Sequence, residues 1–149
     1  MEVTLTVTQD AELDPDRRMS GWTGVPFADV KVGQTYPLRR LIRDAKQVER
    51  FCAIAGWTGA VPDHVPAFLL NELRTLKEFL KLPPGVLHAR EELSLSSPAE
   101  IGEDLEVAVE IADKFIRNDK RFVVFVQTIR SAGDGRQIMS ITRTLYWPC

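Results

Sequence analysis

Residues 51–70 read FCAIAGWTGAVPDHVPAFLL, and this stretch decides how the fold is interpreted. Its first residues continue a helix whose apolar side chains fall at i, i+3, i+4 and i+7, and Gly56 is placed to end that helix. A segment rich in Gly and Pro follows and contains Asp63 and His64. Pro66 fits the first turn of a second helix. The Asp-His pair therefore precedes a helix N-terminus, where backbone N–H groups lack partners within the helix.

Upstream of this stretch, Asp44 is a good helix N-cap, and Gln47 three residues later predicts a capping box. Residues 35–42 predict a short strand. Residues 2–8 alternate strictly between polar and apolar types and predict another strand. Residues 9–28 show little periodicity and are interpreted as an irregular arm that packs on the domain or on a partner.

Downstream, a long apolar helix is expected from Pro66 to the Pro-Pro-Gly sequence at 83–85. Its apolar stripe consists of Leu69, Leu70, Leu73, Leu76, Phe79 and Leu80. Four strands are then expected, at residues 87–95, 105–116, 121–131 and 137–147. Residues 122–126 are apolar on both faces and predict a central strand. This order predicts an α+β hotdog fold, in which an antiparallel meander wraps around one long apolar helix.

The composition is that of an ordinary soluble domain, with 149 residues, 44% hydrophobic and 27% charged. A net charge of −2 gives no reason to expect nucleic acid or a membrane as partner. Cys52 and Cys149 do not form a disulfide framework, so a cytoplasmic protein is expected. The scattered histidines and cysteines lack zinc-ligand spacing, and no cofactor is expected. We expect an arm at 1–31 and one domain at 32–149.

Five segments in this order resemble the MaoC-like hydratase/dehydratase group of the hotdog superfamily, including its half-domains without a complete active site. Residues 32–34 (VGQ) resemble the opening strand, and residues 51–56 (FCAIAG) resemble a Phe-Ala-x-x-Ser-Gly helix end. Residues 87–93 (LHAREEL), 97–98 (SP) and 101–105 (IGEDL) resemble the strand and turns after the long helix.

The resemblance implies a site in which an Asp and a His of a Gly-Asp-x-Asn-Pro-x-His segment activate water for addition to an enoyl thioester. In this sequence Trp57 stands in place of that Asp and Val61 in place of the Asn, while Pro62 and His64 match, in a loop two residues longer than the motif. The implied catalytic residues are His64 and Asp63. The implied substrate-binding residues are Ala67, Phe68, Trp57, Arg39 and Arg40. The implied partners are an acyl thioester of coenzyme A or acyl carrier protein, and a second hotdog subunit in a homodimer or heterodimer.

Asp63, His64 and His88 also have purely structural interpretations. Asp63 fits a helix cap, and His64 fits a turn residue bonded to the backbone. His88 fits a hydrogen-bonded histidine of a sheet. Three functions are left open: a thioester hydratase/dehydratase, a non-catalytic subunit that binds an acyl chain in a heterodimer, and a hotdog thioesterase that uses Glu72 or Glu78 as its carboxylate.

Overall fold

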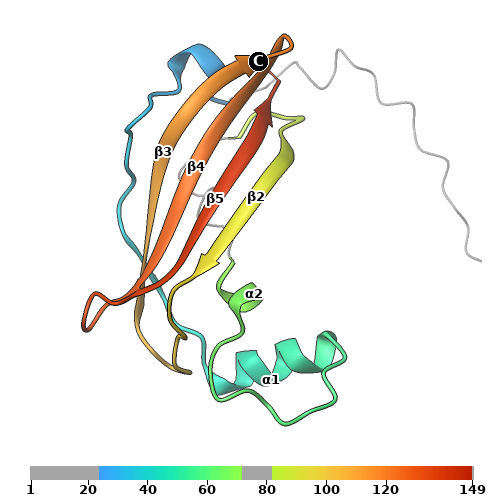
Figure 1. Ribbon diagram of the computed structural model, residues 1–149, viewed down its shortest axis with the longest axis vertical. Coiled ribbons are helices and arrows are strands. Elements are labelled where there is room, and N and C mark those ends of the chain that lie inside the picture. The colour runs from blue at the N-terminus through green and yellow to red at the C-terminus, as the bar shows by residue number, and fades with distance from the viewer. Residues whose placement is uncertain (1–23, 72–81, 149) are drawn as a thin grey trace, which may run out of the picture.

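The computed structural model describes residues 24–71 and 82–148. Its main feature is a five-stranded antiparallel sheet with the strand order β1-β3-β4-β5-β2 (Figure 1). The strands are β1 (Arg39–Leu41), β2 (Leu87–Leu95), β3 (Leu105–Arg117), β4 (Lys120–Ser131) and β5 (Gln137–Trp147). The described helices are η1 (Phe27–Asp29), α1 (Ala45–Ile54) and α2 (Ala67–Leu70). The predicted α+β architecture is confirmed.

The central position of β4 is also confirmed, because β4 lies third of the five strands. On β4, Val123 and Phe125 are buried on one face, and Phe122, Val124 and Val126 are half-buried on the other. β4 follows β3 through a tight turn in which Asn118 and Asp119 have φ values of 50° and 58°. Asn and Asp enter this left-handed region more readily than other residues with side chains, so this turn suits a hairpin.

The predicted four-strand meander was wrong in one respect, because β2 pairs with β5 rather than with β3. The link between β2 and β3 crosses the ends of β5 and β4. At one end Ser96 N–H donates to the Ile138 carbonyl over 2.8 Å, and further along Ala132 N–H donates to the Asp104 carbonyl over 2.9 Å. The chain therefore passes two strands before it enters β3.

One face of the sheet is buried and carries two apolar clusters. On β5 this face consists of Met139, Ile141, Arg143, Leu145 and Trp147. One cluster joins Val48 and Cys52 of α1 and Leu70 of α2 to β3, β4 and β5. The other cluster packs the segment before β1, including the buried Val30, against the same three strands. The helices therefore cover one half of this face, and the N-terminal segment covers the other.

The start and end of α1 agree with the prediction. Asp44 Oδ1 accepts from Gln47 N–H over 2.8 Å, and Gln47 Oε1 accepts from Asp44 N–H over 3.0 Å, which completes the capping box. After the last turn Gly56 has a φ of 69°, a conformation that ends a helix with little strain in glycine.

The strand predicted at 35–42 was too long, because regular pairing is limited to β1. Thr35 makes one isolated bridge to Glu110. Pro37 lies between that bridge and β1, and it has no N–H to donate to the ladder, so the pairing is interrupted there.

Two predictions concern residues outside the described part of the chain. They are the strand at 2–8 and most of the long helix, whose positions 72–81 include Leu73, Leu76, Phe79 and Leu80 as well as Glu72 and Glu78. The described beginning of that helix is α2, directly after Pro66.

The described part of the N-terminal arm is tied to the sheet. Trp147 Nε1 donates to the Val25 carbonyl over 2.9 Å. Lys114 Nζ donates to three carbonyls at and after η1, those of Phe27, Ala28 and Val30, over 3.2, 3.2 and 2.7 Å. The proposed division between residues 31 and 32 stays a prediction.

Among the described residues, no helix is long and apolar enough to cross a membrane.

Candidate functional site

The backbone around His64 is fixed by pairing with a distant segment. His64 forms an isolated antiparallel bridge with Glu100, and Val65 N–H donates to the Ala99 carbonyl over 2.9 Å. Val65 is buried, whereas the side chains of Asp63 and His64 are exposed. Neither side chain has a hydrogen bond to another described residue in this structure. The backbone is therefore held in place while the imidazole is left accessible.

Trp57 closes the loop that follows α1. Its backbone N–H donates to the Cys52 carbonyl over 2.9 Å, and its indole Nε1 donates to the Ala60 carbonyl over 2.8 Å. The indole thus shapes the loop at the position where the resemblance implies a carboxylate. Trp57 is 56% exposed, so it is accessible to solvent.

Ala67 and Phe68 begin α2 directly after this segment. Leu69 N–H already donates to the Pro66 carbonyl over 2.9 Å, so the N–H groups of Ala67 and Phe68 stand at the helix start. At the other end of this turn, Arg43 Nε donates to the Leu69 carbonyl over 2.9 Å. Arg43, in the segment before α1, therefore holds the first turn of α2 in place.

Apolar side chains surround this loop and are accessible to solvent. Phe68 is 75% exposed and Ile54 is 77% exposed. A hollow of about 220 Å³ is lined by Gln47, Arg50, Phe51, Ile54 and Leu69. Exposed apolar surface is a common feature of ligand and partner sites.

The two arginines implied to bind substrate lie on a different element. Arg39 and Arg40 belong to β1, the edge strand opposite β2. Arg40 Nη1 is 3.1 Å from Asp104 Oδ2, and its Nη2 is 3.3 Å from Glu106 Oε1. The charge of Arg40 is thus matched by carboxylates at the start of β3.

Of the seven predicted site residues, five come from residues 57–68 and two from β1.

A polar cluster that was not predicted lies on the buried face of the sheet. Arg143 of β5 is fully buried and donates through Nε to Glu91 Oε2 over 2.7 Å. Its other nitrogens donate to Gln127 Oε1 and Asn71 Oδ1. Asn71 Nδ2 in turn donates to Glu91 Oε1 over 2.8 Å. The end of α2 is therefore tied to β2, β4 and β5 through one guanidinium.

His88 joins this cluster at the open edge of the sheet. Its Nε2 is 3.4 Å from Glu91 Oε2. A β-bulge between His88 and Arg90 shifts the register, so that His88 opposes Leu145 and Glu91 opposes Arg143. Leu145 and Arg143 are two residues apart on the buried face of β5. The bulge therefore puts two β2 side chains, three residues apart, on the same face.

The electrostatic balance favours the ionised form of Glu91. Partial burial acts to raise the pKa of this carboxyl, but hydrogen bonds from Arg143 and Asn71 and the charges of Arg143 and His88 outweigh it. The pKa of Glu91 therefore lies below its ordinary value, and a carboxylate faces the guanidinium.

A signal for this cluster was present in the sequence. Arg143 is the one charged residue on the buried face of β5, and a buried charge requires a partner. Glu91 lies 52 residues earlier, so the sequence of β5 alone does not identify it as the partner.

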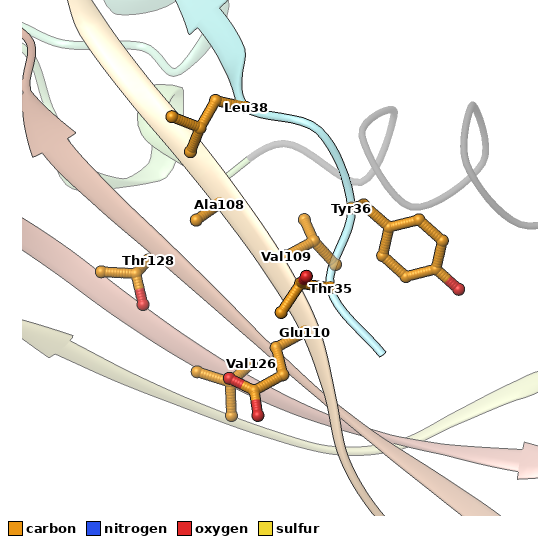
Figure 2. A pocket seen from close by; sticks show the side chains of 8 residues that line it. All are labelled: Thr35, Tyr36, Leu38, Ala108, Val109, Glu110, Val126 and Thr128. Atoms are coloured by element: carbon orange, nitrogen blue, oxygen red, sulfur yellow. The ribbon is translucent and has the colours of Figure 1, made fainter. Parts of the chain in front are cut away.

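Another hollow, of about 280 Å³, lies where the segment before β1 meets β3 and β4 (Figure 2). It is lined by Thr35, Tyr36, Leu38, Ala108, Val109, Glu110, Val126 and Thr128. Burial raises the pKa of the Tyr36 hydroxyl. This hollow contains none of the predicted site residues, so it is separate from the candidate site.

Among residues 24–71 and 82–148, no three His, Cys, Asp or Glu side chains are grouped to hold a metal ion.

Solved structures share this fold. R-hydratase PhaJ1 from Pseudomonas aeruginosa has a TM-score of 0.59 at 20% identity, covering 84% of this chain and 86% of that one. The HadBC (3R-hydroxyacyl-ACP dehydratase) complex from Mycobacterium tuberculosis has a TM-score of 0.58 at 17% identity, covering 77% and 96%. The MaoC-like dehydratase from Rhodospirillum rubrum has a TM-score of 0.57 at 19% identity, covering 83% and 97%.

At these identities the likeness establishes the fold, and the chain has an α+β hotdog fold like that of the MaoC-like dehydratase and the hydratase it matches. No protein-family model matches the sequence, and no curated protein sequence matches it.

Proposed function

We propose that this protein is a hotdog subunit that hydrates enoyl thioesters, or dehydrates 3-hydroxyacyl thioesters, of coenzyme A or acyl carrier protein. The observation that carries the proposal is the position of His64. Its backbone is paired with Glu100, its imidazole is exposed, and it lies three residues before Ala67, the first residue of α2. An accessible histidine beside oriented N–H donors is suited to acid-base chemistry on a carbonyl compound.

In the proposed reaction His64 takes a proton from water as the oxygen bonds to C3 of the enoyl group. The C2–C3 π electrons move toward the thioester carbonyl, and the N–H groups of Ala67 and Phe68 stabilise the developing negative charge. His64 then returns a proton to C2, so water is added without a net change in the enzyme. Asp63 supplies a carboxylate beside His64, and the exposed rings of Trp57 and Phe68 contact the acyl chain.

A second candidate is a non-catalytic subunit that binds an acyl chain in a heterodimer. Trp57 favours it, because its indole is bonded to the Ala60 carbonyl where the resemblance implies the acid. HadBC, one of the structures with this fold, is described as a complex. The third candidate, a thioesterase, needs a carboxylate at Glu72 or Glu78, which lie outside the described residues, so it stays a hypothesis.

In either case the partner is proposed to be a second hotdog subunit that pairs along β2. Among the described strands, β2 has one neighbour, β5, and its other edge carries no strand. Leu93 and Leu95 are 42% and 57% exposed there. The bulge at the start of β2 interrupts regular pairing, so residues 90–95 offer the usable edge.

The test is turnover of crotonyl-CoA and longer enoyl-CoA substrates by the purified protein, followed by loss of enoyl absorbance and by release of free CoA. We expect His64→Ala to reduce hydration by about 10²–10⁴-fold, the range for loss of an acid-base group. Thr58→Ala, in the same exposed loop, is the matched control and should retain the rate.

Other results separate the candidates. Hydration that appears only after a second hotdog subunit is added, and that survives His64→Ala, supports the non-catalytic subunit. Release of CoA without hydration supports the thioesterase. If the wild-type protein neither turns over nor binds an acyl thioester, alone or with a second subunit, the thioester proposal is wrong.

A further inference from the structure

The two histidines of the chain, His64 and His88, lie near opposite ends of β2. His88 is the second residue of this strand, which runs from the end of the sheet that holds the C-terminus towards α2 (Figure 1). His64 pairs with Glu100, which follows the end of the strand at Leu95. At about 3.3 Å per residue, the strand separates the two histidines by roughly 20 Å, so they do not meet within one chain.

The imidazole of His88 lies on the buried face of the sheet. The β-bulge of β2 sets His88 opposite Leu145, which is buried on that face of β5. His88 Nε2 is 3.4 Å from Glu91 Oε2, and this carboxylate is tied to Arg143. Because an ionised carboxylate only accepts hydrogen bonds, Nε2 carries the proton and Nδ1 keeps its lone pair. The His88 side chain is 42% exposed, so it offers a hydrogen-bond acceptor at the open edge of the sheet.

The loop that carries His64 lies against the same face at the other end of β2. Val65, the next residue, belongs to one buried cluster with Met139, and Met139 opposes Leu95 at the end of the strand. Val65 N–H also donates to the Ala99 carbonyl, in the link that follows the strand. The end of β2 and the loop of His64 are therefore neighbours on this face.

A second copy of this chain would pair with the open edge of β2 in antiparallel orientation, because a two-fold axis reverses the strand direction. Residues directly opposite in such a pair point to the same face. Leu93 opposite the partner's Leu93 meets this condition, and it sets Glu92 opposite the partner's Ser94. The register centred on Glu92 places like charges together, which is destabilising, and the register centred on Ser94 pairs fewer residues before the strand ends. The register centred on Leu93 therefore fits the edge best.

In this register the partner's β2 begins beside the end of the first β2. Counting back along the partner's strand, with Ala89 as the extra residue of the bulge, places the partner's His88 opposite Ser97. Ser97 lies three residues before Glu100, the backbone partner of His64. Two-fold pairing thus brings the partner's His88 towards the loop of His64, on the same face of one continuous sheet.

We propose that His88 of one subunit completes the His64 site of the other in a homodimer paired along β2. Its Nδ1 accepts a hydrogen bond from the water that His64 deprotonates, and this contact orients the water towards C3 of the enoyl group. It supplies a second polar group where Trp57 stands in place of the implied Asp. Glu91 is a positioning residue that fixes the tautomer and direction of His88. The inference rests on the proposed hydratase function and changes no proton in the reaction given above.

Complementation between two inactive variants tests whether the site is shared. His64→Ala and His88→Ala should each reduce hydration of crotonyl-CoA by about 100-fold or more, as for an acid-base group. When they are co-expressed in equal amounts, each mixed dimer has one site with both histidines and one site with neither. Random pairing makes about half of the dimers mixed, so about a quarter of the wild-type rate should return. His64→Ala co-expressed with the double variant His64→Ala/His88→Ala is the matched control and should recover nothing.

A disulfide cross-link tests the register without any turnover. In a Cys149→Ser background, Leu93→Cys lies on the two-fold axis and should form a covalent dimer under mild oxidation. Leu95→Cys replaces the other exposed leucine at the end of β2 and lies too far from its own copy to do so. The remaining cysteine, Cys52, is buried. Light scattering shows whether His88→Ala is still a dimer.

Two results would overturn the inference. One is a mixed sample as inactive as either variant alone while the wild type hydrates crotonyl-CoA, because the two histidines then share no site across subunits. The other is a Leu93→Cys protein that stays uncross-linked, or that cross-links no faster than Leu95→Cys. A wild-type protein that hydrates no enoyl thioester refutes the proposed function instead, and the cross-link still decides whether His88 reaches the partner's loop.

Discussion

Arg143 and Glu91 face each other across the β5–β2 pair, with Arg143 Nε 2.7 Å from Glu91 Oε2. The guanidinium is buried, and the carboxylate has a 21% exposed side chain. This contact joins the interior of the sheet to its open edge. It also connects the end of α2 to the strands, because Asn71 bonds to both partners.

Loss of the Glu91 charge should destabilise the fold strongly. Glu91→Gln leaves Arg143 buried without its counter-ion, and we expect a loss of at least about 2 kcal/mol in the free energy of unfolding. The neighbouring Glu92→Gln is the matched control, because Glu92 pairs with Arg90 at the surface, and it should cost under about 1 kcal/mol. Urea unfolding followed by circular dichroism measures both. Equal losses in the two variants would refute the role assigned to Arg143.

Stability should fall in acid as Glu91 and Glu103 become protonated. At Glu103 burial acts to raise the pKa, but hydrogen bonds from Glu100 N–H, Ser131 and Arg136 and the Arg136 charge outweigh it. The folded-state pKa of each carboxyl lies below 4.5, its ordinary value. The unfolded chain therefore binds these protons first as the pH decreases.

This added stability is complete above about pH 4.5 and is lost as the pH falls through the folded-state pKa values. Urea midpoints measured between pH 7 and pH 3 should decrease most steeply in this acid range. Glu103→Gln should flatten the decrease. An unchanged slope in that variant would contradict the assignment.

The capping box of α1 should make a measurable contribution to stability. Asp44→Ala removes the acceptor for Gln47 N–H, and we expect a loss of about 1 kcal/mol. Asp44→Asn keeps an acceptor and should cost only a few tenths of a kcal/mol. Thermal unfolding of the three proteins side by side measures the difference. A loss of equal size in the Asn variant would show that the charge matters and the cap does not.

Lys114 should hold the described part of the N-terminal arm on the sheet. Its ammonium donates to three carbonyls at η1 and lies 5.2 Å from the Phe27 ring centroid. Lys114→Met should increase hydrogen exchange and protease cleavage at residues 24–30 several-fold. Lys31→Met, which removes an exposed lysine close to η1, should leave both unchanged. Protection in Lys114→Met equal to wild type would contradict this role.

The β2 edge should control association with a second hotdog subunit. Leu93→Lys places a charge on the exposed edge, and we expect it to shift the protein from dimer to monomer in light scattering coupled to gel filtration. Leu38→Lys replaces another leucine, which is 60% exposed near β1, and should keep the wild-type mass. A Leu93→Lys protein that stays dimeric would place the interface elsewhere.

Locally determined features could be predicted from the sequence. The capping box depends on Asp44 and Gln47, three residues apart, and β2 and β5 have the predicted bounds because alternation and turns are short-range patterns. The pairing of β2 with β5 could not be predicted in this way. It depends on how the 96–104 link crosses the sheet, and alternation carries no information about strand order.

The candidate site was predictable only where its residues are consecutive. Residues 57–68 hold Trp57 and His64 in one loop, so the motif was visible in the sequence. The cluster around Arg143 joins residues from α2, β2, β4 and β5, and a bulge sets the direction of His88. A pattern of alternating polar and apolar residues predicts the two faces of one strand at a time, and it does not show where a bulge inserts a residue. The cluster around Arg143 could therefore be recognised only in the structure.

The open side of β2 has a consequence for how the protein behaves in a cell. Among the described strands β2 has a neighbour on one side only, so in the proposed dimer the folded fraction depends on the concentration of the pairing chain. In the proposed dimer, dilution lowers the stability of the fold, and an excess of one subunit leaves β2 edges available for mispairing. If the proposed partner is a different hotdog subunit, balanced synthesis of the two chains limits such mispairing.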